Sequence, residues 1–161
     1  MLIARDIMQA KPRSVSPETT LPELQRTLLS ARMSGFPVVQ DGRLVGVVSR
    51  SDVVRHLSVE QSLGEMLSDY QREAGGENGD EAFLERVAQH LGRRMEKLRV
   101  ADVMITSVLS VPPDAPLEVV ARMLVDNRIH RLLVVEGGRL LGLISSTDLV
   151  RRVAEGRLEA R

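Results

Sequence analysis

The sequence contains no cysteine and no tryptophan, and its aromatic residues are one tyrosine and two phenylalanines. Without cysteine, the chain can form no disulfide bond and has no thiolate nucleophile, and the usual zinc sites are not expected. Because aromatic side chains are so few, the core must consist of Val, Leu, Ile, Ala and Met, within an apolar fraction of 43%.

The chain also lacks an excess of charge, since 22 basic residues balance 22 acidic ones. A neutral, evenly mixed chain has no general attraction to nucleic acid or to an anionic membrane surface, so neither is expected as a partner. No apolar run is long enough to span a bilayer, and the first residues lack the apolar region of a signal peptide. We therefore expect a soluble cytoplasmic protein that forms one compact unit or two small ones.

One segment of the chain occurs twice. Asp6–Arg55 aligns without a gap with Asp102–Arg151, at a constant offset of 96 positions. A repeat of this length is too long for a solenoid unit and short for an ordinary independent domain. The repeat predicts two half-domains with pseudo-two-fold symmetry, and functional sites that occur in pairs, one in each copy.

Each copy has the same order of expected elements, namely strand, helix, strand, strand and helix. In the first copy, Thr20 can cap a helix, and Asp41-Gly42 suits a tight hairpin turn between two apolar strands. The last helix of this copy is expected to begin at Ser51 or Asp52. The order of elements indicates the α+β class.

The second copy repeats this pattern, with Gly137-Gly138 at the turn and a last helix from Thr147. Between the copies, apolar residues at helical spacing lie on both sides of a glycine-rich break, which predicts an inserted helical hairpin. The expected organisation is a first repeat at 1–57, the helical insert at 58–99, and a second repeat with a C-terminal helix at 100–161.

These features together resemble the cystathionine-β-synthase (CBS) domain family, and two such domains in tandem resemble a Bateman module. The matching segments of the two copies are 6–8 and 102–104, 15–18 and 111–114, and 46–52 and 142–148. The resemblance covers about two thirds of the chain, and its specificity comes from the whole pattern occurring twice in register. It implies β-α-β-β-α repeats and regulatory binding of adenosine ligands such as AMP, ADP, ATP or S-adenosylmethionine, without catalysis.

The resemblance also implies site residues, because serine and aspartate positions of this family face the ribose and phosphate of the ligand. In this sequence these positions are Ser49 and Asp52 in the first copy, and Ser145 and Asp148 in the second. The chemistry is suitable, since a ribose diol needs a carboxylate that accepts two hydrogen bonds. An aspartate at a helix start is also stabilised by the helix dipole.

A structural role for the two aspartates is the alternative. Asp52 and Asp148 follow a strand and precede a helix, where aspartate is a common N-cap. If Ser51 and Thr147 capped these helices instead, the aspartates would remain free for a ligand.

Adenine needs an apolar slot with backbone groups along its edge. Apolar residues at the strand starts could form one slot in each copy, although such residues are also ordinary core residues. The candidates are Val15, Phe36 and Pro37 in the first copy, and Val111, Leu132 and Leu133 in the second.

Phosphate groups need cations or backbone donors. His130-Arg131 in the second copy resembles the phosphate-contacting pair of energy-sensing kinase regulatory subunits in this family. The first copy has Ser34-Gly35 at the same positions, which weakens the case for a phosphate site there, although Arg50 could substitute. The alternative for both arginines is a solvated surface charge.

The sequence contains no catalytic constellation, so we expect no enzyme activity and no catalytic cofactor. The three histidines, at positions 56, 90 and 130, are scattered, so a metal site is not expected. Neither a Gly-x-Ser-x-Gly elbow nor a glycine-rich phosphate loop is present.

The function expected is therefore regulation: an adenosine nucleotide of the AMP, ADP or ATP type, with S-adenosylmethionine less favoured, binds between the two repeats and signals by conformational change. A homodimer is expected, because apolar stripes on the helices of both copies need cover. The alternative is a ligand-independent dimerisation scaffold that docks an unknown protein partner through the helical insert.

Overall fold

The computed structural model describes residues 2–56, 58, 89, 92–93 and 96–156. The helical hairpin expected at 58–99 lies almost entirely outside these residues, so it stays a prediction. Among the helices of the described residues, none combines the length and the apolar character that crossing a membrane requires.

The chain is divided into two compact units that do not coincide with the sequence repeats. One unit comprises Met1–Ser14, Val39–Gly46 and Thr106–Arg161, and the other comprises Val15–Val38 and Val47–Ile105. The N-terminal segment of the first copy thus belongs to the unit built from the second copy, and the start of the second copy belongs to the unit built from the first. We call them unit 1 and unit 2.

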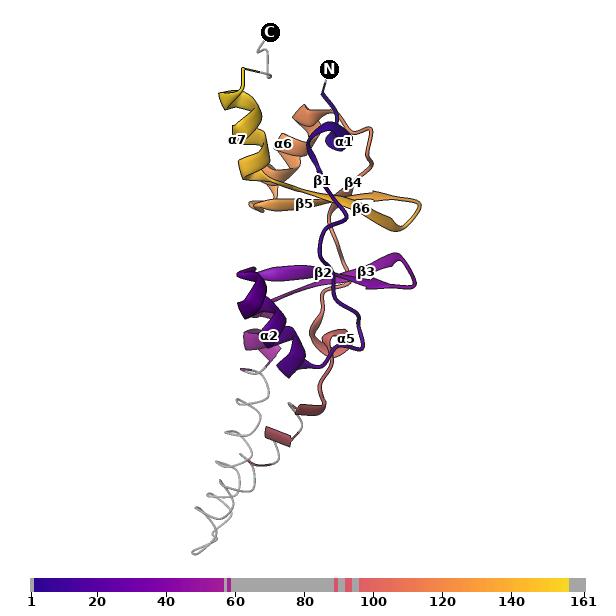
Figure 1. Ribbon diagram of the computed structural model, residues 1–161, viewed down its shortest axis with the longest axis vertical. Helices are drawn as coiled ribbons and strands as arrows, with labels where there is room; N and C mark the ends of the chain where they lie inside the picture. Colours follow the sequence, from indigo (N-terminus) through magenta and orange to yellow (C-terminus); the bar gives the residue numbers. More distant parts are fainter. Residues whose placement is uncertain (1, 57, 59–88, 90–91, 94–95, 157–161) are drawn as a thin grey trace, which may run out of the picture. The chain divides into compact units, whose positions relative to one another are not determined.

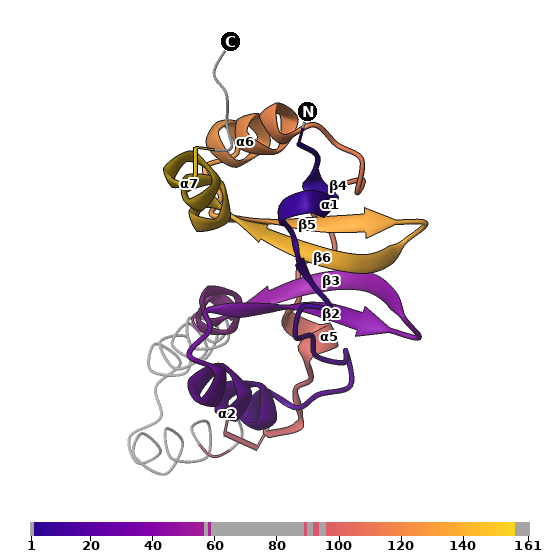
Figure 2. The same cartoon turned by 45° about the horizontal axis from the view of Figure 1, so that its top comes forward.

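Unit 1 has a sheet with helices on one side. Strand β5 pairs antiparallel with β6 and parallel with β4, and β1 pairs antiparallel with β6. Figures 1 and 2 show α1, α6 and α7 on the same side of the β5–β6 pair. The elements are α1 (Ala4–Ile7), β1 (Gln9–Ala10), β4 (Ser110–Val111), α6 (Leu117–Asp126), β5 (Arg131–Glu136), β6 (Arg139–Ser145) and α7 (Ser146–Ala154).

The core of unit 1 lies between this sheet and its helices. Alternate residues of a strand face opposite sides of the sheet, so Leu132 and Val134 on β5 point to the same face as Ile144 on β6. All three are fully buried. One hydrophobic cluster contains them together with Ala4, Ile7, Val111, Ala115, Leu117, Val120 and Leu124.

Unit 2 contains α2 (Leu21–Ala31) and α5 (Val100–Val103), and a helix that begins at Arg50. Strands β2 (Gly35–Gln40) and β3 (Arg43–Ser49) form a hairpin whose turn region is grouped with unit 1. In Figure 2, α2 and α5 lie on one side of this hairpin. The strand–helix–strand–strand–helix order is confirmed, with a single bridge at residue 15 in place of the first strand.

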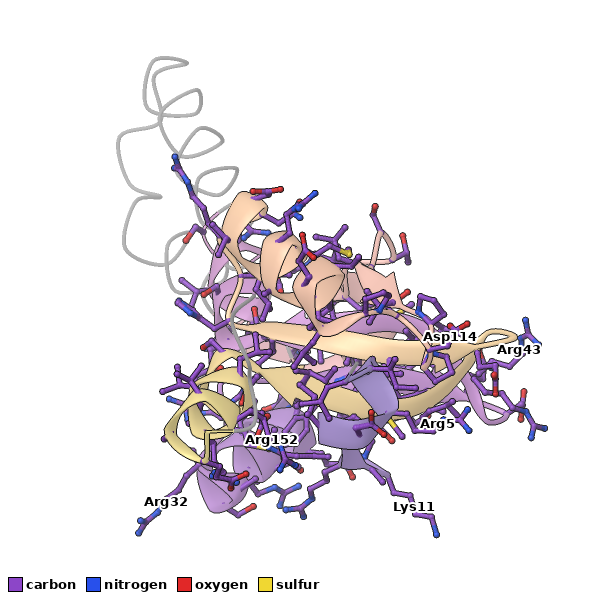
Figure 3. All side chains as sticks on the ribbon, turned by 90° about the horizontal axis from the view of Figure 1, so that it is seen from above. Arg5, Lys11, Arg32, Arg43, Asp114 and Arg152 are labelled. Carbon is purple, nitrogen blue, oxygen red and sulfur yellow. The ribbon has the colours of Figure 1, made fainter. Side chains whose placement is uncertain are left out.

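The cap predicted for α2 is confirmed. The Thr20 side chain accepts a hydrogen bond from the Glu23 amide, and the Glu23 carboxylate accepts one from the Thr20 amide, which is a capping box. The helix is followed by the C-cap Arg32, whose φ of 51° is left-handed and whose side chain extends outward in Figure 3.

The two predicted hairpin turns are confirmed. Asp41 and Gly42 have φ of 51° and 75°, and Gly137 and Gly138 have 56° and 80°. Two successive positive φ angles are typical of the type I′ turn, whose twist matches that of the flanking strands.

The start of each copy packs on the other copy in the same way. In unit 1, the Ala4 amide of α1 donates to the Ala115 carbonyl at 2.8 Å, just before α6. In unit 2, the Val100 amide of α5 donates to the Thr19 carbonyl at 2.8 Å, just before α2. Because these four residues are equivalent in the repeat, the exchange of segments is reciprocal.

Candidate functional site

The Ser-x-x-Asp sequence of the second copy forms a capping box at the start of α7. The Asp148 Oδ2 atom accepts hydrogen bonds from the Ser145 hydroxyl at 2.6 Å and from the Ser145 amide at 2.8 Å. The Ser145 hydroxyl in turn lies 3.3 Å from the Asp148 amide. Two backbone donors at the helix start are satisfied in this way. Asp148 itself is buried, at 7% exposed.

The first copy has the same arrangement with the same distances. Asp52 Oδ2 accepts from the Ser49 hydroxyl at 2.6 Å and from the Ser49 amide at 2.8 Å, and Asp52 is 6% exposed. The equality of the two sites is what the repeat predicts.

The alternative cap positions were wrong. The N-cap of α7 is Ser145, and the helix begins at Ser146 rather than at Thr147. In the first copy, helical residues begin at Arg50, ahead of Ser51. The strand and the helix are contiguous in both copies, so the last strand residue is itself the cap and the aspartates take part in the capping.

The second carboxylate oxygen of each aspartate has a different partner in each copy. Asp148 Oδ1 lies 3.3 Å from the side-chain amide nitrogen of Gln9, which lies 3.2 Å from Oδ2 as well. Asp52 Oδ1 lies 3.2 Å from a guanidinium nitrogen of Arg55, one turn further along its own helix. The partner of Asp148 thus comes from a distant segment, and that of Asp52 from a local one.

The environment of Asp148 favours its charged form. Burial by itself raises the pKa of this carboxyl, but the hydrogen bonds from the Ser145 hydroxyl and amide and from Gln9, together with the positive charge of Arg151, lower it further than burial raises it. The net pKa lies below its ordinary value, so the group is an ionised acceptor at neutral pH.

The strand register places further candidate residues beside Ser145. Arg131 on β5 is the direct cross-strand partner of Ser145, and Leu133 is that of Leu143. Gln9 on β1 is paired with Leu143 from the other side. Directly paired residues share a face of the sheet, so Arg131, Leu133 and Gln9 lie on the face of Ser145, opposite the core helices.

This register places the adenine candidates of the second copy on opposite faces of the sheet. Val111 and Leu132 belong to the cluster on the helix side, whereas Leu133 lies on the face of Ser145 and Arg131. In the first copy, Val15 donates its amide to Pro37 at 3.0 Å and forms a bridge with Val38. Pro37 is equivalent to Leu133 in the repeat, and Phe36 to Leu132.

The phosphate candidates lie in different places. His130 and Arg131 are exposed, and the His130 carbonyl accepts a hydrogen bond from the Ser146 amide at 3.0 Å. Arg50, in unit 2, lines an apolar groove of about 500 Å³ between α2 and the helix that follows β3.

The first copy cannot hold a larger side chain opposite Ser49 without rearrangement. Gly35 occupies the position of Arg131, and a Cβ atom there would lie 2.7 Å from the Val48 carbonyl oxygen. The close approach of β3 therefore explains why the first copy has glycine where the second copy has Arg131.

Gln9 was missed by the sequence analysis. It lies in the entry segment of the first copy, and its equivalent in the second copy is Ile105, which has no side-chain donor. The difference is visible in the sequence, but its meaning depends on β1 pairing with β6 across more than a hundred residues. Over the part of the chain that the structure describes, no group of three His, Asp or Glu side chains is placed to hold a metal ion.

Comparison with known proteins gives a consistent result. The model of the CBS domain matches residues 4–59 and 100–155. The uncharacterized protein MJ1426 of Methanocaldococcus jannaschii is 31% identical over 93% of this chain and 90% of its own length. The inosine-5'-monophosphate dehydrogenase of Thermoplasma acidophilum is 28% identical over 94% of this chain, which spans 22% of that enzyme. The crystal structure of CBSX2 in complex with AMP superposes with a TM-score of 0.69 at 25% identity, covering 98% of this chain and 100% of that one.

Proposed function

Because the chain belongs to the CBS domain family, we propose that it is a regulatory module that binds an adenosine nucleotide of the AMP, ADP or ATP type. The observation that carries the proposal is the pair of buried Ser-x-x-Asp sites with equal geometry in the two copies. The AMP complex of CBSX2, whose crystallised chain has the same fold and is covered in full by this chain, supports the choice of ligand.

The chemistry of the second copy fits such a ligand. An ionised aspartate offers about four acceptor positions, and Ser145 uses part of those on Oδ2. The vicinal hydroxyls of a ribose can donate to the remaining positions, chiefly on Oδ1. Leu133, buried on the same face, would contribute an apolar wall beside a base, and Arg131 offers a cation for a phosphate.

The two sites should differ in their preference for phosphate, and the Asp148 site should bind phosphorylated ligands more tightly. Arg131 lies opposite Ser145, whereas Gly35 takes this position in the first copy. A charge-assisted hydrogen bond contributes about 1.5–3 kcal/mol, which corresponds to roughly tenfold or more in affinity.

The module would regulate rather than catalyse. A nucleotide shifts the balance between two arrangements of the chain by its differential affinity for them, and an unknown protein partner would respond to that shift. The match to a segment that makes up 22% of a dehydrogenase agrees with such an accessory role.

A thermal denaturation series tests the proposal. A ligand that binds only the native state raises the melting temperature, so millimolar AMP, ADP or ATP should stabilise the protein. S-adenosylmethionine should stabilise it less. Guanosine monophosphate serves as the control for a nonspecific effect of a nucleotide. The absence of a shift with every adenosine ligand would leave the ligand-independent scaffold as the better account.

A homodimer is the second part of the proposal. Among the exposed apolar residues, two pairs are equivalent in the repeat: Leu29 at 60% with Val125 at 74%, and Val54 at 60% with Val150 at 65%. A single exposed apolar side chain is ordinary, but the same pair exposed in both copies suggests a surface that a second chain covers.

A further inference from the structure

The carboxylates of Asp52 and Asp148 have different hydrogen-bond partners in the structure. Asp148 accepts the side-chain amide of Gln9 at both carboxylate oxygens. An ionised carboxylate only accepts hydrogen bonds, so the NH2 group of Gln9 must face it, and the assignment of this amide is not ambiguous. Within the described residues, the hydrogen bond that the structure gives to Asp148 Oδ1 is the one from Gln9.

Gln9 is held in this position by its backbone. It pairs with Leu143, and Ala10 pairs with Gly142, in the antiparallel ladder between β1 and β6. The Lys11 amide extends the ladder with a hydrogen bond of 3.2 Å to the Leu141 carbonyl. The side chain of Gln9 therefore starts from a fixed point on the sheet face that Ser145 also occupies.

The side-chain contact itself is easy to break. Its two distances of 3.3 and 3.2 Å are long for N–H···O hydrogen bonds, and Gln9 is exposed. The hydrogen bonds from Ser145 to Asp148 are shorter, at 2.6 and 2.8 Å. A group that competes for the carboxylate would therefore displace Gln9 and leave the capping box in place.

We propose that Gln9 is an internal competitor for the ligand site of Asp148. The side-chain amide of Gln9 must leave the Asp148 carboxylate before a ribose diol can bind. This proposal rests on the proposed function. It makes Gln9 a residue that sets the affinity of one site and not of the other, because Ile105, its equivalent in the repeat, presents no donor to Asp52.

The repeat itself provides the substitutions for a test. Ile105 forms a bridge with Val47, and Gln9 pairs with the equivalent residue Leu143. Isoleucine and glutamine thus each occur in the same local pairing. Gln9→Ile removes the competitor from the Asp148 site. Ile105→Gln introduces one at the Asp52 site.

The measurement is calorimetric titration of the full-length protein with adenosine, which carries no phosphate. Asp52→Asn isolates the Asp148 site, and Asp148→Asn isolates the Asp52 site. A net hydrogen bond contributes about a factor of three to ten in affinity, so Gln9→Ile should tighten binding at the Asp148 site about threefold to tenfold. Ile105→Gln should weaken binding at the Asp52 site by a similar factor, and Ile105→Val should leave the Asp148 site unchanged.

Four outcomes are distinguishable. Tighter binding in Gln9→Ile supports the proposal, as does binding that appears only in this variant. Unchanged or weaker binding, with the wild type binding adenosine, overturns it and leaves the proposed function intact. Binding by no variant overturns both. If an Asp→Asn variant fails to fold, the side-chain amide resonances of Gln9 in the wild-type protein decide, since they must shift on saturation with adenosine if the contact is released.

Discussion

At the scale of single residues, Asp52 and Asp148 combine a structural and a candidate binding role. Each carboxylate closes a capping box with the serine three positions earlier, at equal distances in the two copies. The helix start needs one carboxylate oxygen. The other oxygen is held by Arg55 in the first copy and by Gln9 in the second. A residue that caps a helix can therefore still offer acceptor positions to a ligand.

Asp148 should make stability depend on pH. Its pKa is lower in the folded chain than its ordinary value of 3.8, so its contribution to stability is fully present above that value. The contribution is lost as the pH falls through the ordinary value toward the lower, folded one. Asp148→Asn removes the titrating group.

Urea denaturation of both proteins at a series of pH values is the measurement. The difference in unfolding free energy between wild type and Asp148→Asn should shrink as the pH is lowered from about 6 to about 3. A difference that stays constant over this range would show that Asp148 has the same pKa in the folded and unfolded chain.

Arg131 should determine the preference for phosphate. Arg131→Ala should reduce the affinity for AMP about tenfold and leave the affinity for adenosine unchanged, as calorimetry would measure. The matched control is Arg122→Ala, because Arg122 is an exposed arginine on α6 that is ion-paired with Glu118. Equal losses for AMP and adenosine would mean that Arg131 does not contact the phosphate.

The sequence indicated the candidate site residues but not their contacts. Ser49, Asp52, Ser145 and Asp148 could be singled out because the motif occurs twice. Their capping role was not assigned correctly, since a cap depends on the residue at which the strand ends, and element ends are the least certain feature of a sequence pattern. Gln9 could not be placed, because its partner is 139 positions away.

At the scale of helices and strands, the sequence predicted the elements well where local chemistry determines them. The two turns and the cap at Thr20 followed from residue types alone. The short elements α1, β1 and α5 were not predicted. Two to four residues carry too little periodicity for recognition, and these segments are stabilised by hydrogen bonds to the other copy.

The serine caps should contribute measurably to stability. Ser145→Ala removes the side-chain acceptor at the start of α7 and should lower the unfolding free energy by about 1 kcal/mol, as should Ser49→Ala in the first copy. Thr147→Ala is the control, since Thr147 is exposed and is not the cap. Chemical denaturation measures all three, and a larger loss for Thr147→Ala than for Ser145→Ala would contradict the assigned cap.

The exchanged segments predict where a core substitution acts. Ile7 lies in the first copy but packs in the cluster with Val120 and Leu124 of the second. Ile7→Ala should destabilise the protein by about 2–5 kcal/mol and speed hydrogen exchange in α6. Val103→Ala, the equivalent change, should speed exchange in α2 instead.

Hydrogen exchange followed by mass spectrometry resolves the two helices. The prediction depends on the two units and not on the sequence repeats. Faster exchange in α2 after Ile7→Ala, with α6 unaffected, would mean that the N-terminal segment packs on its own copy.

At the scale of the whole molecule, the exposed apolar pairs predict a homodimer. Light scattering at tens of micromolar should give twice the mass of one chain. Leu29→Glu with Val125→Glu should shift the protein toward the monomer, because a charge in an apolar interface is costly. Glu118→Lys, at an exposed position of α6, is the control. A wild-type protein that is monomeric at this concentration would contradict the prediction.

The internal repeat is the property of the whole chain that the sequence conveyed most directly. It led us to expect paired sites, and the two capping boxes have the same hydrogen-bond distances. The differences between the copies, Arg131 against Gly35 and Gln9 against Ile105, are the reason why we expect the two proposed sites to differ in ligand preference.

The measurement that tests the central claim most directly is calorimetric titration of the nucleotide-stripped protein with AMP, beside the double variant Asp52→Asn, Asp148→Asn. Both substitutions nearly keep the side-chain volume and remove the carboxylate that a ribose needs. We expect saturable binding of AMP by the wild type and no detectable binding by a folded double variant. Binding of AMP with unchanged affinity by the double variant, or no binding of any adenosine ligand by the wild type, would contradict the account.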